Sequence, residues 1–190
     1  MKRAIPLTAV ILMLVSGAVL ADREVEDYSE AIDIFKSNEV AAPFFSSAYG
    51  YAVFPNIGKG GMGIGAARGQ GQVYHSGKVT GFTAMTNVSF GLQLGGQAYR
   101  QVIFFENKKA YDAFTSGEFE FSAQAGAIAI QASGQAGTST EGSGASGSTG
   151  TAQVKSADYD NNLLVFTMAK GGLMYEATLA GQKYSYDPVE

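Results

Sequence analysis

Apolar side chains near the start of the chain recur at helical spacing. Within residues 22–38 the apolar positions lie three or four residues apart, and acidic side chains occupy the opposite face. This spacing is typical of an amphipathic helix. The apolar positions are Val25, Tyr28, Ile32 and Phe35. The sequence therefore predicts an N-terminal helix that packs its apolar face onto the rest of the domain.

From Tyr49 onward the pattern becomes that of extended chain. Residues 49–54 form a short aromatic-rich run that Pro55 would close, because proline interrupts a strand. In the next predicted strand, residues 61–74, small residues occupy alternate positions and would all lie on one face. They are Gly61, Gly63, Gly65, Ala67, Gly69 and Gly71. Because glycine weakens a strand by about 0.5–1 kcal/mol relative to alanine, we expect another element to approach this bare face closely.

The remaining sequence predicts further short strands and one short internal helix. The helix would begin after Asn107, a good N-terminal cap, and end at Gly117. The further strands are expected at residues 79–88, 89–99, 101–105, 153–159, 163–169, 173–179 and 182–186. About eight strands with two or three helices, of which the N-terminal helix and the short internal helix are located here, predict an α+β domain that is mainly antiparallel β-sheet.

Residues 132–152 are a biased tract of Gly, Ser and Thr. Such a composition cannot bury a hydrophobic core. Because strands are predicted on both sides of it, we expect a flexible loop within one domain rather than a domain boundary.

The first 21 residues have the organisation of a secretory signal peptide. Lys2 and Arg3 precede an apolar run that is too short to span a bilayer, and small residues follow up to Ala21. We expect cleavage after Ala21, which leaves residues 22–190 as a single domain. The protein would then be exported, to the periplasm or the extracellular space, or held peripherally at the outer membrane.

The charge balance and the cysteine count exclude several classes of partner and site. Cleavage would leave 11 basic against 17 acidic residues, a net charge of −6. Nucleic-acid binding requires a basic excess, so no nucleic-acid partner is expected. The chain has no cysteine, which excludes disulfides, thiol catalysis and cysteine-based metal sites.

No pattern in the chain predicts catalysis, a metal site or a cofactor. His75 is the only histidine, and no serine or carboxylate pattern accompanies it, so we expect an exposed turn residue. Residues 58–63 match G-x-G-x-x-G, the glycine pattern of dinucleotide-binding loops. They run into a strand, however, and no acidic residue lies between Tyr49 and Phe105 to bind a ribose. The sequence therefore predicts a protein that is not an enzyme.

Five aromatic residues lie within eleven positions and are followed by a lysine. Aromatic rings beside a cation are typical of a membrane-interface patch. The alternative is that most of these rings fill the core between the N-terminal helix and the sheet. Together with two cations farther along the chain, the candidate lipid-binding residues are Phe44, Phe45, Tyr49, Tyr51, Phe54, Lys59, Arg68 and Lys78.

Four ordered segments resemble the successive blocks of the SYLF domain, which is also described as a lipid-binding or yeast-type actin-binding domain. Within residues 45–186 they are AYGYAVFPNIGKGGMGIGAARGQGQVY, SFGLQLGGQAYRQVIFFEN, KKAYDAF and KGGLMYEATLAGQKYSY. The chain is similar to secreted bacterial members, which also carry a signal peptide and a short helix. The resemblance implies a non-catalytic module that binds membrane lipid, phosphoinositides in eukaryotic members, with actin bundling in some.

The expected partner of this chain is membrane lipid or the envelope surface. Residues 22–38 are acidic, whereas phosphoinositide binding in the family is associated with a basic N-terminal segment. Export would also separate the protein from cytosolic actin. Two alternatives remain open. One is a small outer-membrane β-barrel, which the signal peptide, the lack of cysteine and about eight strands fit. The other is an envelope interaction protein that recruits a partner through residues 132–152.

Overall fold

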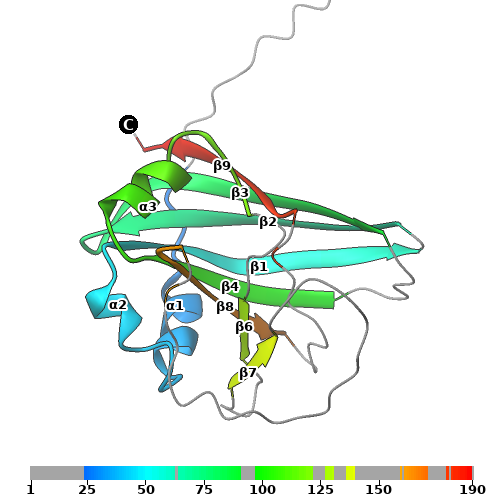
Figure 1. Ribbon diagram of the computed structural model, residues 1–190, viewed down its shortest axis with the longest axis horizontal. Helices are drawn as coiled ribbons and strands as arrows, with labels where there is room; N and C mark the ends of the chain where they lie inside the picture. Colours follow the sequence, from blue (N-terminus) through cyan, green and yellow to red (C-terminus); the bar gives the residue numbers. More distant parts are fainter. Residues whose placement is uncertain are drawn as a thin grey trace, which may run out of the picture.

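The computed structural model is a mainly antiparallel β-sheet with three short helices in the residues that it describes (Figure 1). Those residues are 24–62, 64–90, 97–121, 127–130, 136–139, 159, 161–170, 179 and 181–189. The helices are α1 (Ser29–Lys36), α2 (Phe44–Ser47) and α3 (Lys108–Phe114). The strands are β1 (Gly50–Met62), β2 (Ile64–His75), β3 (Lys78–Phe90), β4 (Gln97–Phe105), β5 (Glu118–Glu120), β6 (Ala127–Ile130), β7 (Ala136–Ser139), β8 (Leu163–Ala169) and β9 (Lys183–Pro188).

The strands follow the order β5-β9-β3-β2-β1-β4-β8-β6-β7 across the sheet. In the described residues, neighbouring strands are antiparallel except for β6 and β8, which run parallel. The expected α+β class and mainly antiparallel sheet are therefore confirmed. The strand count differs from the expected number of about eight, because the described residues form nine strands, and α2 is the third of the two or three expected helices. Among the described strands, β5 and β7 lie at the two ends of this order.

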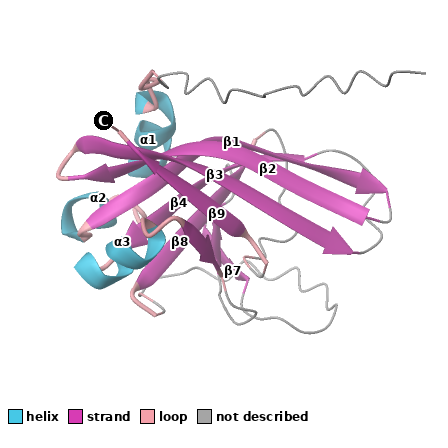
Figure 2. Ribbon diagram, turned by 90° about the horizontal axis from the view of Figure 1, so that it is seen from above, coloured by secondary structure: helices cyan, strands magenta, loops and turns pink. Residues whose placement is uncertain are grey.

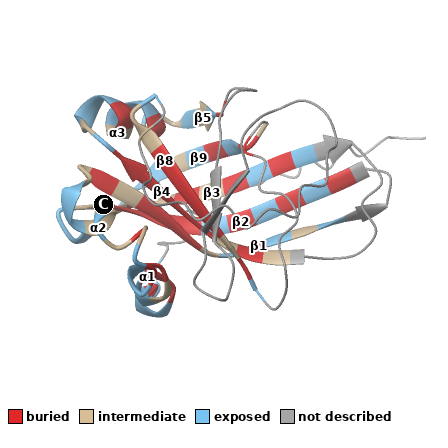
Figure 3. Ribbon diagram, turned by 60° about the horizontal axis from the view of Figure 1, so that its bottom comes forward, coloured by how far each residue is buried: buried red, intermediate tan, exposed pale blue. Residues whose placement is uncertain are grey.

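The central strands bury side chains on both faces of the sheet. Along β4, Ile103 and Phe105 belong to a hydrophobic layer that includes residues of α3. The intervening Val102 and Phe104 belong to a second layer with residues of α1 and α2. We name the two sides the α3 face and the α1 face. Because both faces are covered here, residues 102–105 of β4 form a continuous apolar run, and Figure 3 shows the buried positions of the strand in red.

Helix α1 packs one apolar side on the α1 face. Its buried side chains are Ala31, Ile32 and Phe35. The helix begins only after Asp27, whose carboxylate accepts a hydrogen bond from the Ser29 N–H at 2.9 Å. The helical prediction is wrong for residues 24–28, because this segment is bonded to β2 instead. There the Gln72 side chain donates to the Glu26 carbonyl at 3.1 Å.

Strand β1 continues through Pro55, where the sequence predicts a break. Its register against β2 shifts between Val53 and Asn56, and its register against β4 shifts at the same place. This β-bulge accommodates a residue without an N–H, since the hydrogen-bond ladder is already interrupted there.

The glycine-rich segment forms a hairpin rather than the single expected strand over residues 61–74. β1 ends at Met62 and β2 begins at Ile64, and Gly61 pairs in register with Gly65. Gly63, between the two strands, lies outside the described residues. The local pattern could not show this, because the alternation of small residues continues unbroken across the turn.

The close approach to the glycine face is confirmed on β2. A Cβ added at Gly69 would lie 2.5 Å from Cγ1 of Ile57, and one added at Gly71 would lie 2.7 Å from Cδ1 of Phe54. Both large side chains come from the neighbouring strand β1. The glycines of β2 therefore make room for side chains that fill the α3 face.

The C-terminal half agrees with the prediction in some elements and not in others. The Asn107 side chain accepts a hydrogen bond from the Ala110 N–H at 3.1 Å, and α3 ends before Gly117, which has a φ of 127°. β8 has the expected bounds, whereas β9 extends two residues past the predicted strand. Residues 136–139 of the Gly/Ser/Thr tract form β7 against β6, so the loop expectation is wrong there. The rest of the tract lies outside the described residues.

Candidate functional site

Five of the eight candidate lipid-binding residues gather at one end of the sheet. This end, which we name the helical end, consists of α2, the β2–β3 turn and α3 (Figures 1 and 2). The residues there are Phe44, Phe45, Tyr49, Tyr51 and Lys78. They come together because α2 leads into β1 and because β2 ends, and β3 begins, beside the start of β1.

The two phenylalanines of α2 are half-buried. The Phe44 ring lies 5.7 Å from that of Phe104 and 5.5 Å from that of Tyr159, measured between centroids. The Phe45 ring lies 4.9 Å from Phe104, and the Lys36 ammonium lies 5.5 Å from its centroid. Each ring is therefore partly packed into the core, as the alternative interpretation of these aromatic residues expects, and partly exposed to solvent.

Tyr49 belongs to an aromatic stack that includes the histidine. Its ring lies 4.3 Å from the ring of His75, and Tyr111 lies 5.6 Å from Tyr49. The His75 Nδ1 is 2.7 Å from the Tyr49 carbonyl oxygen, so Nδ1 carries the hydrogen and donates. The expectation of an exposed turn residue is wrong, because this stack half-buries His75 at the end of β2.

Tyr51, on β1, stacks on the ring of Tyr74 on the neighbouring strand β2. Its ring lies 5.0 Å from that of Tyr74, and burial raises the pKa of both phenols. At physiological pH the two side chains are therefore uncharged and add no anion to the helical end.

Three lysines lie on the elements that form the helical end. Lys78 is exposed beside the β2–β3 turn, and Lys108 and Lys109 are exposed in the first turn of α3. The Lys108 ammonium is 2.6 Å from a carboxylate oxygen of Asp112, so part of its charge is balanced. The helical end thus combines half-exposed aromatic rings with cations.

The other three candidate residues lie elsewhere. Phe54 is fully buried on the α3 face, with its ring 5.5 Å from that of Tyr184, so it cannot touch a surface in this conformation. Lys59 pairs in register with the buried Ala67 and shares the α3 face. Arg68 pairs with Gly58 and points to the opposite face. The eight residues therefore do not form one patch.

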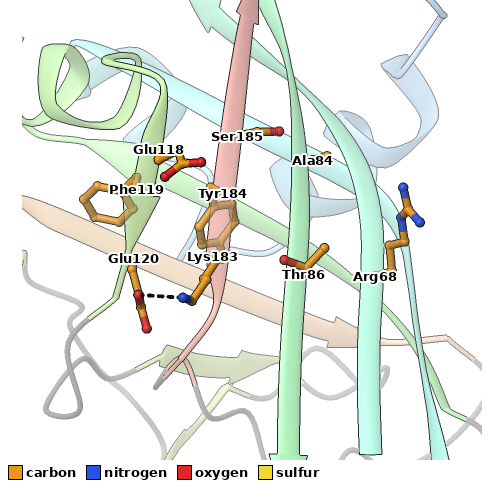
Figure 4. A pocket seen from close by; sticks show the side chains of 9 residues that line it. All are labelled: Arg68, Ala84, Thr86, Glu118, Phe119, Glu120, Lys183, Tyr184 and Ser185. Atoms are coloured by element: carbon orange, nitrogen blue, oxygen red, sulfur yellow. Dashed lines mark ion pairs between the residues drawn. The ribbon is translucent and has the colours of Figure 1, made fainter. Parts of the chain in front are cut away.

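Sequence reasoning missed a cleft on the α1 face of β2, β3, β9 and β5 (Figure 4). One row of register partners crosses the four strands as Arg68, Thr86, Lys183 and Glu120. The adjacent row contributes Ala84, Ser185 and Glu118. The cleft has a volume of about 550 Å³. These residues are far apart in the sequence, and only the pairing of β9 between β3 and β5 brings them together.

Two further observations concern classes of site. In the part of the chain that the structure describes, no three His, Asp or Glu side chains are placed to hold a metal ion. No helix among the same residues has the length and apolar character needed to cross a bilayer.

Comparison with known proteins places this chain in a family. The family model described as "Las17-binding protein actin regulator" (Ysc84) matches residues 86–188, just over half of the chain. The chain is also 27% identical over 158 residues to beta cell expansion factor A of Aeromonas veronii, which covers 82% of this chain and 52% of that protein. It therefore spans about half the length of this curated relative. The resemblance seen in the four sequence segments is confirmed, and the chain belongs to the Ysc84 family of SYLF-domain proteins.

Proposed function

We propose that this chain is an exported, non-catalytic module that binds membrane lipid or another surface of the cell envelope through its helical end. The observation that carries the proposal is the combination of half-exposed aromatic rings with exposed lysines at that end. Membership of a family associated with lipid binding supports it.

The energetics favour apolar contact over general electrostatic attraction. The mature chain would carry a net charge of −6, which repels an anionic membrane. A local cation such as Lys78 or Lys109 contributes only about 1 kcal/mol near an anionic surface. Insertion of the exposed parts of Phe44 and Phe45 would therefore supply most of the binding energy, and salt would weaken binding modestly.

The names of the relatives suggest other partners that fit this chain less well. The family description refers to Las17 binding and to actin regulation. Residues 1–21 have the pattern of a signal peptide, and an exported protein would not meet cytosolic actin. Lipid or the envelope surface is therefore the partner that we propose.

Vesicle flotation of the mature protein tests the proposed surface. Phe44 and Phe45 also pack on Phe104, so their replacement would disturb the fold. The exposed Ser46 and Ser47 of α2 are better targets. The double variant Ser46→Glu, Ser47→Glu places two charges beside the rings, and we expect it to lose most of its binding to vesicles because a charge resists entry into the interface.

The matched control is Lys170→Glu, which changes an exposed residue after β8 and should float like the unaltered protein. Circular dichroism would show that both variants remain folded. Undiminished flotation of the α2 double variant would contradict a surface at the helical end. The export part of the proposal is tested separately by N-terminal sequencing of the protein from the producing cells, which should begin at Asp22.

A further inference from the structure

The cleft on the α1 face takes no part in the proposed contact at the helical end. It lies across β2, β3, β9 and β5, over a floor formed by the small side chains of Ala84, Thr86 and Ser185 (Figure 4). Its volume of about 550 Å³ is within the range of small-molecule sites, about 300–1,000 Å³. Arg68 on β2 lies on one side of that floor, Glu118 and Glu120 on β5 lie on the other, and Lys183 on β9 lies between them.

The two cationic side chains of the cleft are suited to an oxyanion that lies between them. Arg68 is exposed and makes no ion pair with any residue that the structure describes. Lys183 is two strands away in the same row, about 10 Å from Arg68 at the usual strand spacing. Thr86 lies between them in register. Two long cationic side chains can therefore converge on one phosphate or carboxylate, to which the Thr86 hydroxyl can donate.

The opposite side of the cleft is suited to a cation. Glu120 lies 3.4 Å from the Lys183 ammonium, but both side chains are more than half exposed, and such pairs contribute little to stability. An incoming oxyanion can therefore compete for Lys183. Glu118, in the adjacent row, forms no ion pair within the described part of the chain. Its carboxylate can accept hydrogen bonds from an ammonium group.

We propose that this cleft binds a small zwitterion whose oxyanion lies between Arg68 and Lys183 and whose ammonium group lies against Glu118. The strands of Arg68 and Glu118 are three strand spacings apart, about 14 Å. The two side chains span most of this distance, so the charges of the ligand are separated by only a few bonds. Phosphoethanolamine has this chemistry, either as a free molecule or as a lipid head group. In the second case the inference rests on the proposed lipid-binding function and identifies the lipid class.

Calorimetric titration of the mature protein with O-phosphoethanolamine tests the site without any membrane. We expect saturable binding, and weaker binding of inorganic phosphate or ethanolamine alone. Arg68→Gln should weaken O-phosphoethanolamine binding about tenfold or more, because a charged hydrogen-bond donor is lost. Glu118→Gln should weaken binding of O-phosphoethanolamine but not of inorganic phosphate. Lys170→Gln, outside the cleft, should change neither.

A second measurement identifies the source of the zwitterion. If a lipid presents it, soluble O-phosphoethanolamine will inhibit flotation on phosphatidylethanolamine vesicles, and Arg68→Gln will float less than the unaltered protein. If a free molecule is the ligand, titration will show binding while flotation is insensitive to Arg68→Gln. The absence of saturable binding in both measurements would overturn the proposal, as would binding that survives Arg68→Gln. Neither result would alter the flotation test of the helical end, which uses different residues.

Discussion

Two threonines show how the contribution of a hydroxyl group to stability depends on whether it has a hydrogen-bond partner. Thr167 on β8 is almost fully buried, and its hydroxyl has no hydrogen-bond partner among the described residues. Thr115, just after α3, donates its hydroxyl to the Tyr111 carbonyl at 2.9 Å. A buried polar group without a partner costs about 1–3 kcal/mol, whereas a formed hydrogen bond contributes about 1 kcal/mol.

The first prediction follows from this contrast. Thr167→Val should raise the free energy of unfolding by about 1 kcal/mol, because valine has nearly the same shape and no hydroxyl to desolvate. Thr115→Val should lower it by about 1 kcal/mol, because its hydrogen bond is lost. Urea denaturation of the two variants measures both changes. Destabilisation by Thr167→Val would mean that the hydroxyl binds an ordered water.

At the scale of elements, the β1–β2 hairpin contains glycines of two kinds. Gly69 lies under Ile57, so a methyl group there would force the neighbouring strand to move. A Cβ added at Gly58, on the opposite face of β1, would meet no atom within 4 Å. The same residue type is thus required for packing at one position and dispensable for packing at the other.

We therefore expect opposite effects of the same substitution at the two sites. Gly69→Ala should lower the free energy of unfolding by about 1–3 kcal/mol through overpacking. Gly58→Ala should raise it by about 0.5–1 kcal/mol, because alanine is the better strand residue. Thermal unfolding of the two variants provides the measurement. Equal effects of the two changes would show that Ile57 does not pack on β2 as described.

Local sequence patterns correctly predicted the secondary-structure elements that neighbouring residues determine. They did not predict the features that depend on contacts between residues far apart in the sequence. The Asn107 cap and the strand at residues 163–169 were predictable from short-range signals. The hairpin turn near Gly63 was not, because the alternation of small residues continues across it. The bulge at Pro55 depends on two neighbouring strands, so it could not be read from the residues around the proline.

At the scale of the whole molecule, the same limit applies to the candidate site. The aromatic cluster was visible because most of its members are close in sequence, yet Phe54 is buried and Lys59 and Arg68 lie on opposite faces. The pairing register of β1 decides on which face of the sheet each of these side chains lies. Both the turn of the β1–β2 hairpin and the bulge at Pro55 affect that register. The cleft could not be predicted because its lining residues come from three separate parts of the sequence, at positions 68–86, 118–120 and 183–185.

Buried tyrosines give the whole molecule a predictable response to alkaline pH. Burial, with a smaller contribution from Glu26, raises the pKa of Tyr28 from its ordinary value near 10 to about 12, and burial also raises the pKa of Tyr99 and Tyr184. In the unfolded chain these phenols ionise near pH 10. Stability should therefore be unaffected below pH 10 and fall above it, by up to about 1.4 kcal/mol per pH unit for each such phenol.

Melting temperatures measured from pH 8 to pH 12, with phenolate absorbance recorded in parallel, test this expectation. We expect the melting temperature to fall above about pH 10, and these phenols to ionise only as the protein unfolds. Tyr28→Phe should flatten the decline, because phenylalanine cannot ionise in either state. A constant melting temperature up to pH 12 would contradict the burial of these rings.

The position of β9 also bears on when the protein can finish folding. β9 lies between β3 and β5, and β5 pairs with no other strand in the described residues. Strands β9 and β5 cannot join the sheet until residues 183–188 have left the ribosome. The pairing of β9 with β3 then joins segments about 100 residues apart in the sequence. A chain of this topology stays incomplete throughout its synthesis. That delay is compatible with the export proposed above, in which the chain would cross a membrane in extended form and fold afterwards.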